Sequence, residues 1–389
     1  MAKKKTRRTA PKAAGNNSDS PFAARIKRLR SFMADAGVDT LLVTDPNDVG
    51  YLTGFLGGDS YLLVTPTGKP AIISDARFEE ELEPQRAGFR IVMRTGDIVA
   101  ATVDQVRRLA ERTGIEALGV QAEHLSLHGS ERLKAALKKA KLGARLMAPT
   151  HGLVKRLRER KDETEIALLR KACRIQEAAL EATLPQIDFG MTEFEVCAIL
   201  EYEMKVRGST EPGFTTIVGA QANGSLPHYR PGKTKVKNNS PLLIDWGATQ
   251  SGYHADMCRV FCFGRWPKQI REIYEIVRDA QQLAIDALGP GKSTREVDAA
   301  ARDHIKKHGY GKRYGHGLGH GLGIEVHEAP RLSHMTADVE LEPGHVVTIE
   351  PGIYIPGVGG VRIEDDYAIT ERGRKAISSL PSDIEWATR

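Results

Sequence analysis

Three histidines stand together in one glycine-rich stretch of the chain. The stretch Gly315–His327 carries His316, His320 and His327, and Glu328 follows directly. Neutral imidazole is a nitrogen ligand for divalent metals and also titrates near neutral pH, so the stretch could hold a metal and move a proton. Glycine at every other position is tolerated where the backbone must approach a ligand or another strand. A metal site would still require further donors elsewhere in the chain.

Four carboxylates could complete a metal site with these histidines. Asp245 and Glu350 each end an apolar, strand-like segment, and further acids, Asp256 and Glu364, follow them by eleven and fourteen residues. Converging carboxylates would repel one another at low dielectric, and a pair of divalent cations would relieve that repulsion. With His320 as a nitrogen donor, the set suits two divalent ions about 3.5 to 4 Å apart, as in two-metal hydrolases. The alternative, separate surface ion pairs, fits poorly with acids that end segments of buried-type residues.

The carboxylates stand at equivalent points of an internal repeat. Thr192 and Ser293 are each followed by a glutamate three residues on, which predicts two helix starts. Gly208 and Gly309 predict the matching helix ends. We therefore expect two halves, packed about an approximate twofold axis, whose strands form the floor of one centre. The residues that match at a constant offset of 101 are Gly190, Thr192, Glu195, Val196 and Gly208 with Gly291, Ser293, Glu296, Val297 and Gly309. An arginine also stands near each pair of acids, Arg259 in the first half and Arg362 in the second.

The composition indicates a globular chain with more than one domain. Its 389 residues are 41% apolar, which is enough for substantial cores in two or three domains. No segment approaches the roughly 20 apolar residues that cross a bilayer, and the apolar region of a secretory signal is missing. The four cysteines form no C-x-x-C pair, which fits a reducing compartment. We therefore expect a cytoplasmic protein without membrane association.

The net charge of +6 comes from the first residues of the chain. Residues 1–18 contain six lysines and arginines and no acid, and without them 56 − 6 = 50 basic residues balance 50 acidic residues. We expect residues 1–20 to form a disordered basic tail on a neutral folded body, without specific nucleic-acid binding.

Two folded domains are expected after the tail, over residues 21–155 and 156–389. In the first, short β-rich segments alternate with helical ones, which predicts an α/β domain with a mixed or parallel sheet. The second begins where Asp162 and Glu165 form a variant of the helix-capping box. The expected strands of the first domain are 40–43, 61–65, 71–74, 90–94 and 117–120, with helices over 99–112 and 130–141 after an opening helix that ends at Gly37.

Several motifs together resemble the pita-bread metallopeptidases, which include prolidase, Xaa-Pro aminopeptidase and, more distantly, methionine aminopeptidase. The resemblance covers residues 21–389 and implies an α/β creatinase-like N-terminal domain followed by an α+β pita-bread catalytic domain with an internal pseudo-twofold repeat. Segments 51–55 and 74–77 are similar to the creatinase-type domain of the proline-specific members. The catalytic motifs that carry the resemblance are Asp245–Gly247, His320–Glu328, Ile349–Tyr354 and Gly360–Asp365.

The resemblance implies a dinuclear metal centre. Asp256 and Glu364 would bridge both ions. Asp245 would chelate one ion, and His320 with Glu350 would complete the other. Glu350 would also take the proton from the bridging water. Manganese is the expected metal, with cobalt or zinc as alternatives.

The resemblance also assigns side chains to the substrate. His228 and His327 would contact the substrate carbonyl and the leaving nitrogen without binding metal. Arg331 would hold the free carboxylate of a dipeptide in a charge-assisted bidentate contact, unless it is a surface arginine of a loop. Arg362 and His316 complete the expected substrate pocket, with His316 in its wall.

One residue departs from the family pattern. Cys258 stands in Asp256-Met257-Cys258-Arg259, where the family usually has threonine. A thiol thus replaces a hydroxyl that would orient the metal carboxylates. Because thiols donate weakly, we expect a modest loss of metal affinity.

The resemblance implies a peptidase that hydrolyses the Xaa-Pro bond at the N-terminus of peptides or in Xaa-Pro dipeptides, by attack of a metal-bridging hydroxide. Its expected partners are a proline-containing peptide and a second copy of the chain, in a homodimer. Two alternatives on the same fold are a creatinase-like hydrolase without metal and a non-catalytic binding protein. Both typically lack the full carboxylate set, so two bound divalent ions would argue against both.

Overall fold

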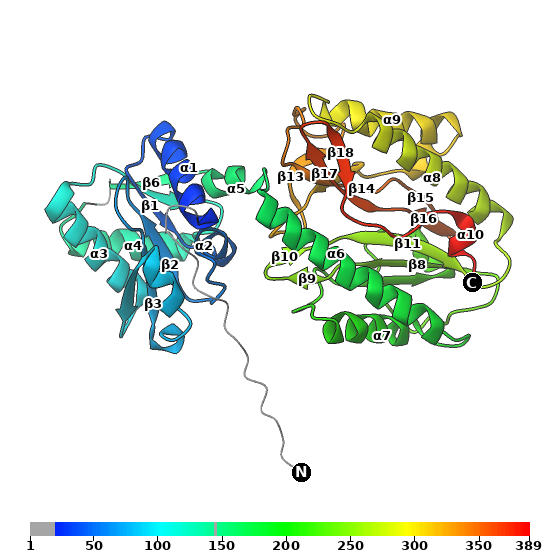
Figure 1. Cartoon of the computed structure of the whole chain (residues 1–389), viewed down its shortest axis with the longest axis horizontal. Helices are drawn as coiled ribbons and strands as arrows, with labels where there is room; N and C mark the ends of the chain where they lie inside the picture. The colour runs from blue at the N-terminus through cyan, green and yellow to red at the C-terminus, as the bar shows by residue number, and fades with distance from the viewer. Residues whose placement is uncertain (1–19, 144–145) are drawn as a thin grey trace, which may run out of the picture. The chain divides into compact units, whose positions relative to one another are not determined.

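The structure, a computed structural model, describes residues 20–143 and 146–389 and divides into two compact units. The first unit ends at Leu157, and the second covers Arg158–Arg389. The expected basic tail lies outside the described residues, apart from Ser20. The colours of Figure 1 run from blue in the first unit to red at the end of the second. Among the described helices, none combines the length and the apolar character that crossing a membrane requires.

The first unit is built on one mixed six-stranded sheet. Its strands are β1 (Thr40–Val43), β2 (Tyr61–Val64), β3 (Ala71–Asp75), β4 (Arg90–Arg94), β5 (Leu118–Gln121) and β6 (Met147–Thr150). Its helices are α1 (Pro21–Asp35), α2 (Pro46–Thr53), α3 (Ile98–Thr113) and α4 (Leu127–Lys139), and α5 (Leu153–Arg158) ends where the second unit begins. The strand order is β4-β3-β2-β1-β5-β6, in which β1 pairs antiparallel with β2 and parallel with β5. Of the two predicted arrangements, a mixed or a parallel sheet, the sheet is mixed.

The second unit contains two helix pairs and a larger set of strands (Figure 1). A long helix packs on a shorter one in each half, α6 (Glu163–Thr183) on α7 (Glu193–Val206) and α8 (Lys268–Ala287) on α9 (Thr294–Lys307). A short helix, α10 (Ile384–Ala387), lies near the end of the chain. The strands are β7 (Ile217–Ala220), β8 (Pro241–Trp246), β9 (Thr249–Gln250), β10 (Tyr253–His254), β11 (Met257–Cys262), β12 (Gly319–Gly321), β13 (Glu328–Leu332), β14 (Val346–Ile349), β15 (Gly352–Ile355), β16 (Gly359–Arg362), β17 (Asp365–Thr370) and β18 (Gly373–Ala376).

Antiparallel strands from the two halves of this unit meet at one place. The two larger sheets have the orders β11-β8-β7 and β13-β12-β14-β17-β18, and two further sheets each pair two strands, β9 with β10 and β15 with β16. A bridge between Cys258 of β11 and Glu364 joins the two larger sheets, and the Glu364 N–H donates to the Cys258 carbonyl at 3.1 Å. The strands of both halves thus form one continuous floor, as the repeat in the sequence predicts.

Side-chain caps start the repeated helices where the sequence predicts them. The capping box predicted for α6 is present. At α7, Thr192 and Glu195 form the reciprocal pair of hydrogen bonds of a capping box. At α9, Ser293 caps the helix, but Glu296 pairs with Lys292 at 3.0 Å instead of closing the box. The second helix start was therefore located correctly, although only half of the expected capping geometry forms there.

The strand that carries Asp245 is fixed against a helix by a buried tryptophan. Trp246 follows Asp245 and is fully buried in the apolar core of the second unit. Its indole N–H donates to the carbonyl of Gln176, on α6, at 3.0 Å. This bond satisfies the one polar atom of the ring and holds the end of β8 in place.

Candidate active site

One cavity of about 980 Å³ in the second unit is lined by every residue that the sequence assigned to metal or substrate. The cavity is formed by loops and strand ends from both halves of the unit. Its size lies at the upper end of the roughly 300–1,000 Å³ that is usual for small-molecule sites. The assigned residues that line it are His228, Asp245, Asp256, His316, His320, His327, Arg331, Glu350, Arg362 and Glu364.

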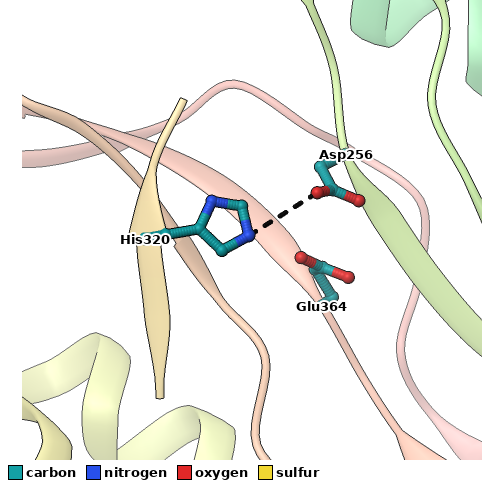
Figure 2. Close-up of side chains that lie close together, drawn as sticks. All are labelled: Asp256, His320 and Glu364. Atoms are coloured by element: carbon teal, nitrogen blue, oxygen red, sulfur yellow. Dashed lines mark ion pairs between the residues drawn. The ribbon is translucent and has the colours of Figure 1, made fainter. Parts of the chain in front are cut away.

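Three of these side chains approach one another closely enough to share a metal ion (Figure 2). One ligand atom each of Asp256, His320 and Glu364 lies within 4.8 Å of the other two. Asp256 precedes β11, His320 is the middle residue of β12, and Glu364 stands between β16 and β17. All three residues are buried. Donors from both halves of the repeat are therefore brought together, as predicted.

The other two predicted ligands lie at the edge of this cluster. Glu350 Oε1 is 3.3 Å from His320 Nε2, and Asp256 Oδ2 is 3.7 Å from the same nitrogen. Asp245 lies directly opposite Cys258 in the pairing of β8 with β11. Two buried carboxylate oxygens, Asp245 Oδ1 and Glu364 Oε1, have no hydrogen-bond partner among the described residues. Acceptors that lack donors are what a divalent cation would satisfy, so this donor set fits a metal centre.

The electrostatics of the cluster lead to the same conclusion. Burial raises the pKa of Asp256 well above the usual carboxyl range, and the charge of Asp245 raises it further. Burial followed by the charges of Asp256 and Glu350 does the same to the pKa of Glu364. Burial also opposes ionisation of Glu350, but the hydrogen bond and charge of His320 outweigh it and lower the pKa of Glu350 to about 2. Bound divalent cations would let all these acids ionise together.

The alternating glycines bring the strand of His320 close to its neighbours. A Cβ atom on Gly319 would lie 2.0 Å from the carbonyl oxygen of Thr348, and one on Gly321 would lie 2.2 Å from that of Ala329. Neither position has room for a side chain. The glycine pattern therefore serves close backbone packing on β14 and β13, which is one of the two uses predicted for it.

The two histidines expected to contact substrate, His228 and His327, both line the cavity. The His327 ring packs edge-on against the His320 ring, with centroids 4.3 Å apart. Burial, together with the neighbouring His320 and Arg331, lowers the pKa of His327 to about 4. His228 is exposed and lies in the loop between β7 and β8. Both side chains therefore line the cavity without belonging to the cluster of Asp256, His320 and Glu364.

A buried hydrogen-bonded chain connects Asp245 to His316. The Arg362 guanidinium donates to Asp245 Oδ2 and, at 2.8 Å, to the Tyr354 hydroxyl. The same hydroxyl lies 2.9 Å from His316 Nε2. The sequence analysis did not single out Tyr354, whose only signal was its place in the Ile349–Tyr354 motif. Arg362, which is expected at the substrate, lines the cavity and donates to Asp245, to Tyr354 and, at 3.4 Å, to the Pro227 carbonyl.

Arg331 and Cys258 lie next to the cluster on neighbouring strands. Arg331 is opposite His320 in the pairing of β12 with β13, and its exposed side chain makes no hydrogen bond or ion pair with a described residue. The Cys258 thiol is fully buried and likewise has no hydrogen bond within the described part of the chain. The thiol at this position therefore orients none of the carboxylates in this structure.

Arg259 does not serve the carboxylate cluster, although the sequence places it near one pair of acids. Its guanidinium donates to Asp365 at 2.8 Å and to the backbone carbonyl of Glu364 at 2.7 Å. It therefore holds the backbone at Glu364 and the side chain of Asp365, whereas Arg362 donates to the side chain of a predicted ligand, Asp245.

A buried ion network that the sequence analysis missed anchors the loop of His327. Glu328, the next residue, accepts from Arg158 Nε at 3.1 Å and from Lys161 Nζ at 2.9 Å. The three side chains are nearly inaccessible to solvent. Burial opposes ionisation of Glu328, but Lys161 and Arg158 outweigh it and lower the pKa of Glu328 to about 2. Only the adjacency of Glu328 to a candidate site histidine could have indicated this role.

Comparison with known proteins shows the class to which this fold and site belong. Residues 167–371 match metallopeptidase family M24, and residues 25–160 match the creatinase/prolidase N-terminal domain. The chain therefore belongs to metallopeptidase family M24 and is a peptidase. Its creatinase-type domain precedes its M24 domain. The family and the fold class predicted from the sequence are confirmed.

Individual relatives cover almost the whole chain. An uncharacterized peptidase of Bacillus subtilis is 37% identical over 92% of this chain and 99% of its own length. An Xaa-Pro dipeptidase of Pyrococcus furiosus is 35% identical over 92% of this chain and 99% of its own. Among solved structures, an Xaa-Pro dipeptidase from Bacillus anthracis matches with a TM-score of 0.88 at 36% identity, covering 93% of this chain and 99% of that one. An X-Pro aminopeptidase from Thermotoga maritima matches with a TM-score of 0.82 at 32% identity, covering 91% and 99%.

Proposed function

We propose that this peptidase hydrolyses the bond between an N-terminal residue and proline, in Xaa-Pro dipeptides or at the N-terminus of longer peptides. One observation carries the proposal. Five candidate metal donors from both halves of a repeat converge in one cavity, beside histidines that do not join the cluster. The names of the Pyrococcus, Bacillus anthracis and Thermotoga relatives support the choice of proline over other residues.

The proposed cofactor is a pair of divalent ions held by Asp245, Asp256, His320, Glu350 and Glu364. Manganese is our first choice, with cobalt and zinc as alternatives. When bound, the ions would lower the pKa of a water molecule and polarise the scissile carbonyl. The buried carboxylate oxygens without donors, Asp245 Oδ1 and Glu364 Oε1, are the part of the donor set that most needs a cation.

The side chains would divide the proton transfers of the reaction among them. Glu350, whose pKa is lowered because the hydrogen bond and charge of His320 outweigh burial, could accept the proton of the attacking water. The proline nitrogen leaves as an amine and must gain a proton as the bond breaks. We assign that proton to Glu350 together with a histidine, either His327 or His228. Arg331, which lacks a described partner, would bind the carboxylate of a dipeptide substrate.

Two other functions on the same fold fit this site less well. A creatinase-like hydrolase and a non-catalytic binding protein would each be expected to lack part of the donor set, whereas all five residues are present here. The membership of a peptidase family also favours catalysis. The homodimer and the cytoplasmic location stay predictions.

A matched set of substrates tests the proposal. The full chain, loaded with manganese, would be assayed on Ala-Pro, on Ala-Pro-Gly-Gly and on Ala-Ala as a control without proline. We expect release of free alanine from at least one proline substrate and little from Ala-Ala. A faster reaction with Ala-Ala, or no reaction with either proline peptide, would refute the proposal. The ratio of the two proline rates separates a dipeptidase from an aminopeptidase.

A further inference from the structure

The catalytic cavity is lined by more cationic side chains than the single carboxylate of a dipeptide could neutralise. Four cationic side chains in its lining are exposed and make no hydrogen bond or ion pair with a described residue. The only carboxylates in the lining are Asp245, Asp256, Glu350 and Glu364, all of which belong to the candidate metal centre. A single free carboxylate would occupy one cation and leave the others uncompensated. The four cations are Arg230, Lys312, Arg313 and Arg331.

Two of these cations lie on a turn that separates the catalytic cavity from a second hollow. The turn consists of residues 311–315, begins with the short 3-10 helix η7 (Gly311–Arg313) and is called here the 311–315 turn. Lys312, Arg313 and Gly315 line both the catalytic cavity and a second cavity of about 910 Å³. Lys306, which pairs with no described residue, adds another cation to the second cavity, and no acidic residue is among the described residues that line it. The positive surface therefore continues out of the catalytic cavity and across the turn.

The direction of this surface follows from the pairing of β12 with β13. His320 lies opposite Arg331, and Gly319 lies opposite Leu332. Further back along the chain, a Cβ on Gly317 would meet the Leu332 carbonyl oxygen at 3.0 Å. His334 then lines the second cavity together with the 311–315 turn. The segment from the turn to His320 thus runs antiparallel to residues 331–334, and the turn lies beyond Arg331, away from His320.

We propose that the 311–315 turn is a binding subsite for acidic residues that follow the proline of a longer substrate. The inference rests on the proposed function, in which Arg331 faces the carboxyl side of the proline. A peptide that continues past proline would pass Arg331, cross Lys312 and Arg313, and reach the second cavity near Lys306. The preferred substrates are then peptides that begin Xaa-Pro and carry glutamate or aspartate at the next positions.

The experiment compares two tetrapeptides that differ only in charge, Ala-Pro-Glu-Glu and Ala-Pro-Gln-Gln, with Ala-Pro as a reference. For the manganese-loaded full chain at low salt, we expect kcat/KM to be about tenfold higher for the acidic tetrapeptide, because two exposed ion pairs each contribute modestly. The difference should appear mainly in KM. It should shrink at about 1 M salt, where the screening length falls to roughly 3 Å.

Two variants connect the preference to the turn. Lys312→Gln combined with Arg313→Gln should reduce the ratio of the two tetrapeptide rates to near one. Both side chains are exposed, so the variant should fold normally. The matched control is Lys307→Gln, which removes an exposed charge from α9 that lines neither cavity, and it should keep the wild-type ratio.

The possible outcomes separate this inference from the proposed function. Equal rates for the two tetrapeptides would overturn the subsite, while their cleavage would leave the proposed function standing. A preference that survives in the double variant would also overturn it. If Ala-Pro and both tetrapeptides resist cleavage, the proposed function fails, and the subsite fails with it.

Discussion

The Arg362 guanidinium binds one oxygen of Asp245 and leaves the other, Oδ1, buried without a donor among the described residues. An arginine in this position compensates part of the negative charge of the cluster and orients the carboxylate. Because one oxygen stays available, the arginine and a metal ion could share Asp245. The candidate centre thus combines a fixed cation of the protein with room for an exchangeable one.

The first prediction concerns Glu364, which is buried and retains an unpartnered oxygen. Glu364→Gln keeps the size of the side chain but removes the charge of a proposed bridging ligand. We expect the bound metal per chain to fall and turnover to drop by more than about 100-fold, since even outer partners of metal ligands cost 10–100-fold. Elemental analysis of the purified protein measures the first effect. Exposed Glu371→Gln is the control, and normal metal content in Glu364→Gln would remove this residue from the centre.

A second prediction separates His327 from the ligand His320, whose ring it touches. If His327 contacts substrate and binds no metal, His327→Ala should keep the full metal content and slow the chemical step by about 10² to 10⁴. Single-turnover kinetics and elemental analysis measure the two quantities. His128→Ala, on the exposed surface of α4, should change neither. Loss of metal from His327→Ala would reverse the roles given to the two histidines.

The third prediction uses Arg331 as a measure of substrate length. In a dipeptide the carboxylate of proline itself could meet the guanidinium, whereas a longer peptide presents an uncharged amide there. Arg331→Met should lower kcat/KM for Ala-Pro by about ten- to a hundredfold, the value of one charge-assisted hydrogen bond. The rate for Ala-Pro-Gly-Gly should hardly change. Equal losses on both substrates would mean that Arg331 supports only the strand on which it stands.

The fourth prediction is the pH dependence of the Glu328 network. The folded pKa of Glu328 is about 2, below an unfolded value of about 4.3. The unfolded chain therefore binds more protons as the pH falls, so the stabilisation is complete above about pH 5 and is lost toward pH 2. At pH 7, Glu328→Gln should lower the free energy of unfolding by about 3–5 kcal/mol, because it takes the buried carboxylate away from Lys161 and Arg158. Arg158 keeps its ion pair with Glu325 at 3.0 Å.

Urea denaturation at several pH values measures this effect. The difference between wild type and Glu328→Gln should narrow as the pH falls from 5. Glu342→Gln is the control, because its pair with Arg160 is about half exposed on both sides and should matter little. A difference that is independent of pH would mean that shape, and not charge, makes Glu328 important.

Local patterns in the sequence predicted most of the elements that position the site. Five of the six described strands of the first unit appear within a residue or two of the expected ranges, since each is a short apolar segment between polar turns. The sixth strand, β6, was not predicted. Helix α2 was missed because only eight residues separate its cap at Asp45 from Gly54. Helix α8 was missed for a different reason. It begins without a side-chain cap, so a search for capping residues does not find it.

The residues of the candidate site likewise include some that the sequence predicted and some that it did not. Its acids end buried strands and its histidine lies among glycines, and these are signals within single segments. The partners of those residues carry no such signal. Arg362 contacts Asp245 across 117 positions of the chain, and Arg158 contacts Glu328 across 170. Pairings of this kind are decided by the packing of whole elements, so the sequence did not reveal that Tyr354 and Glu328 support the site.

The division of the donors between two halves means that this site could not be transplanted as a single segment. The shortest continuous stretch that holds all five runs from Asp245 to Glu364, and it leaves behind α6, α7 and β7. Those elements hold β8 in place through the Trp246 bond to Gln176 and through the pairing of β7 with β8. A grafted stretch would therefore carry the correct side chains on an unsupported first strand. A protein engineer would have to move the whole second unit.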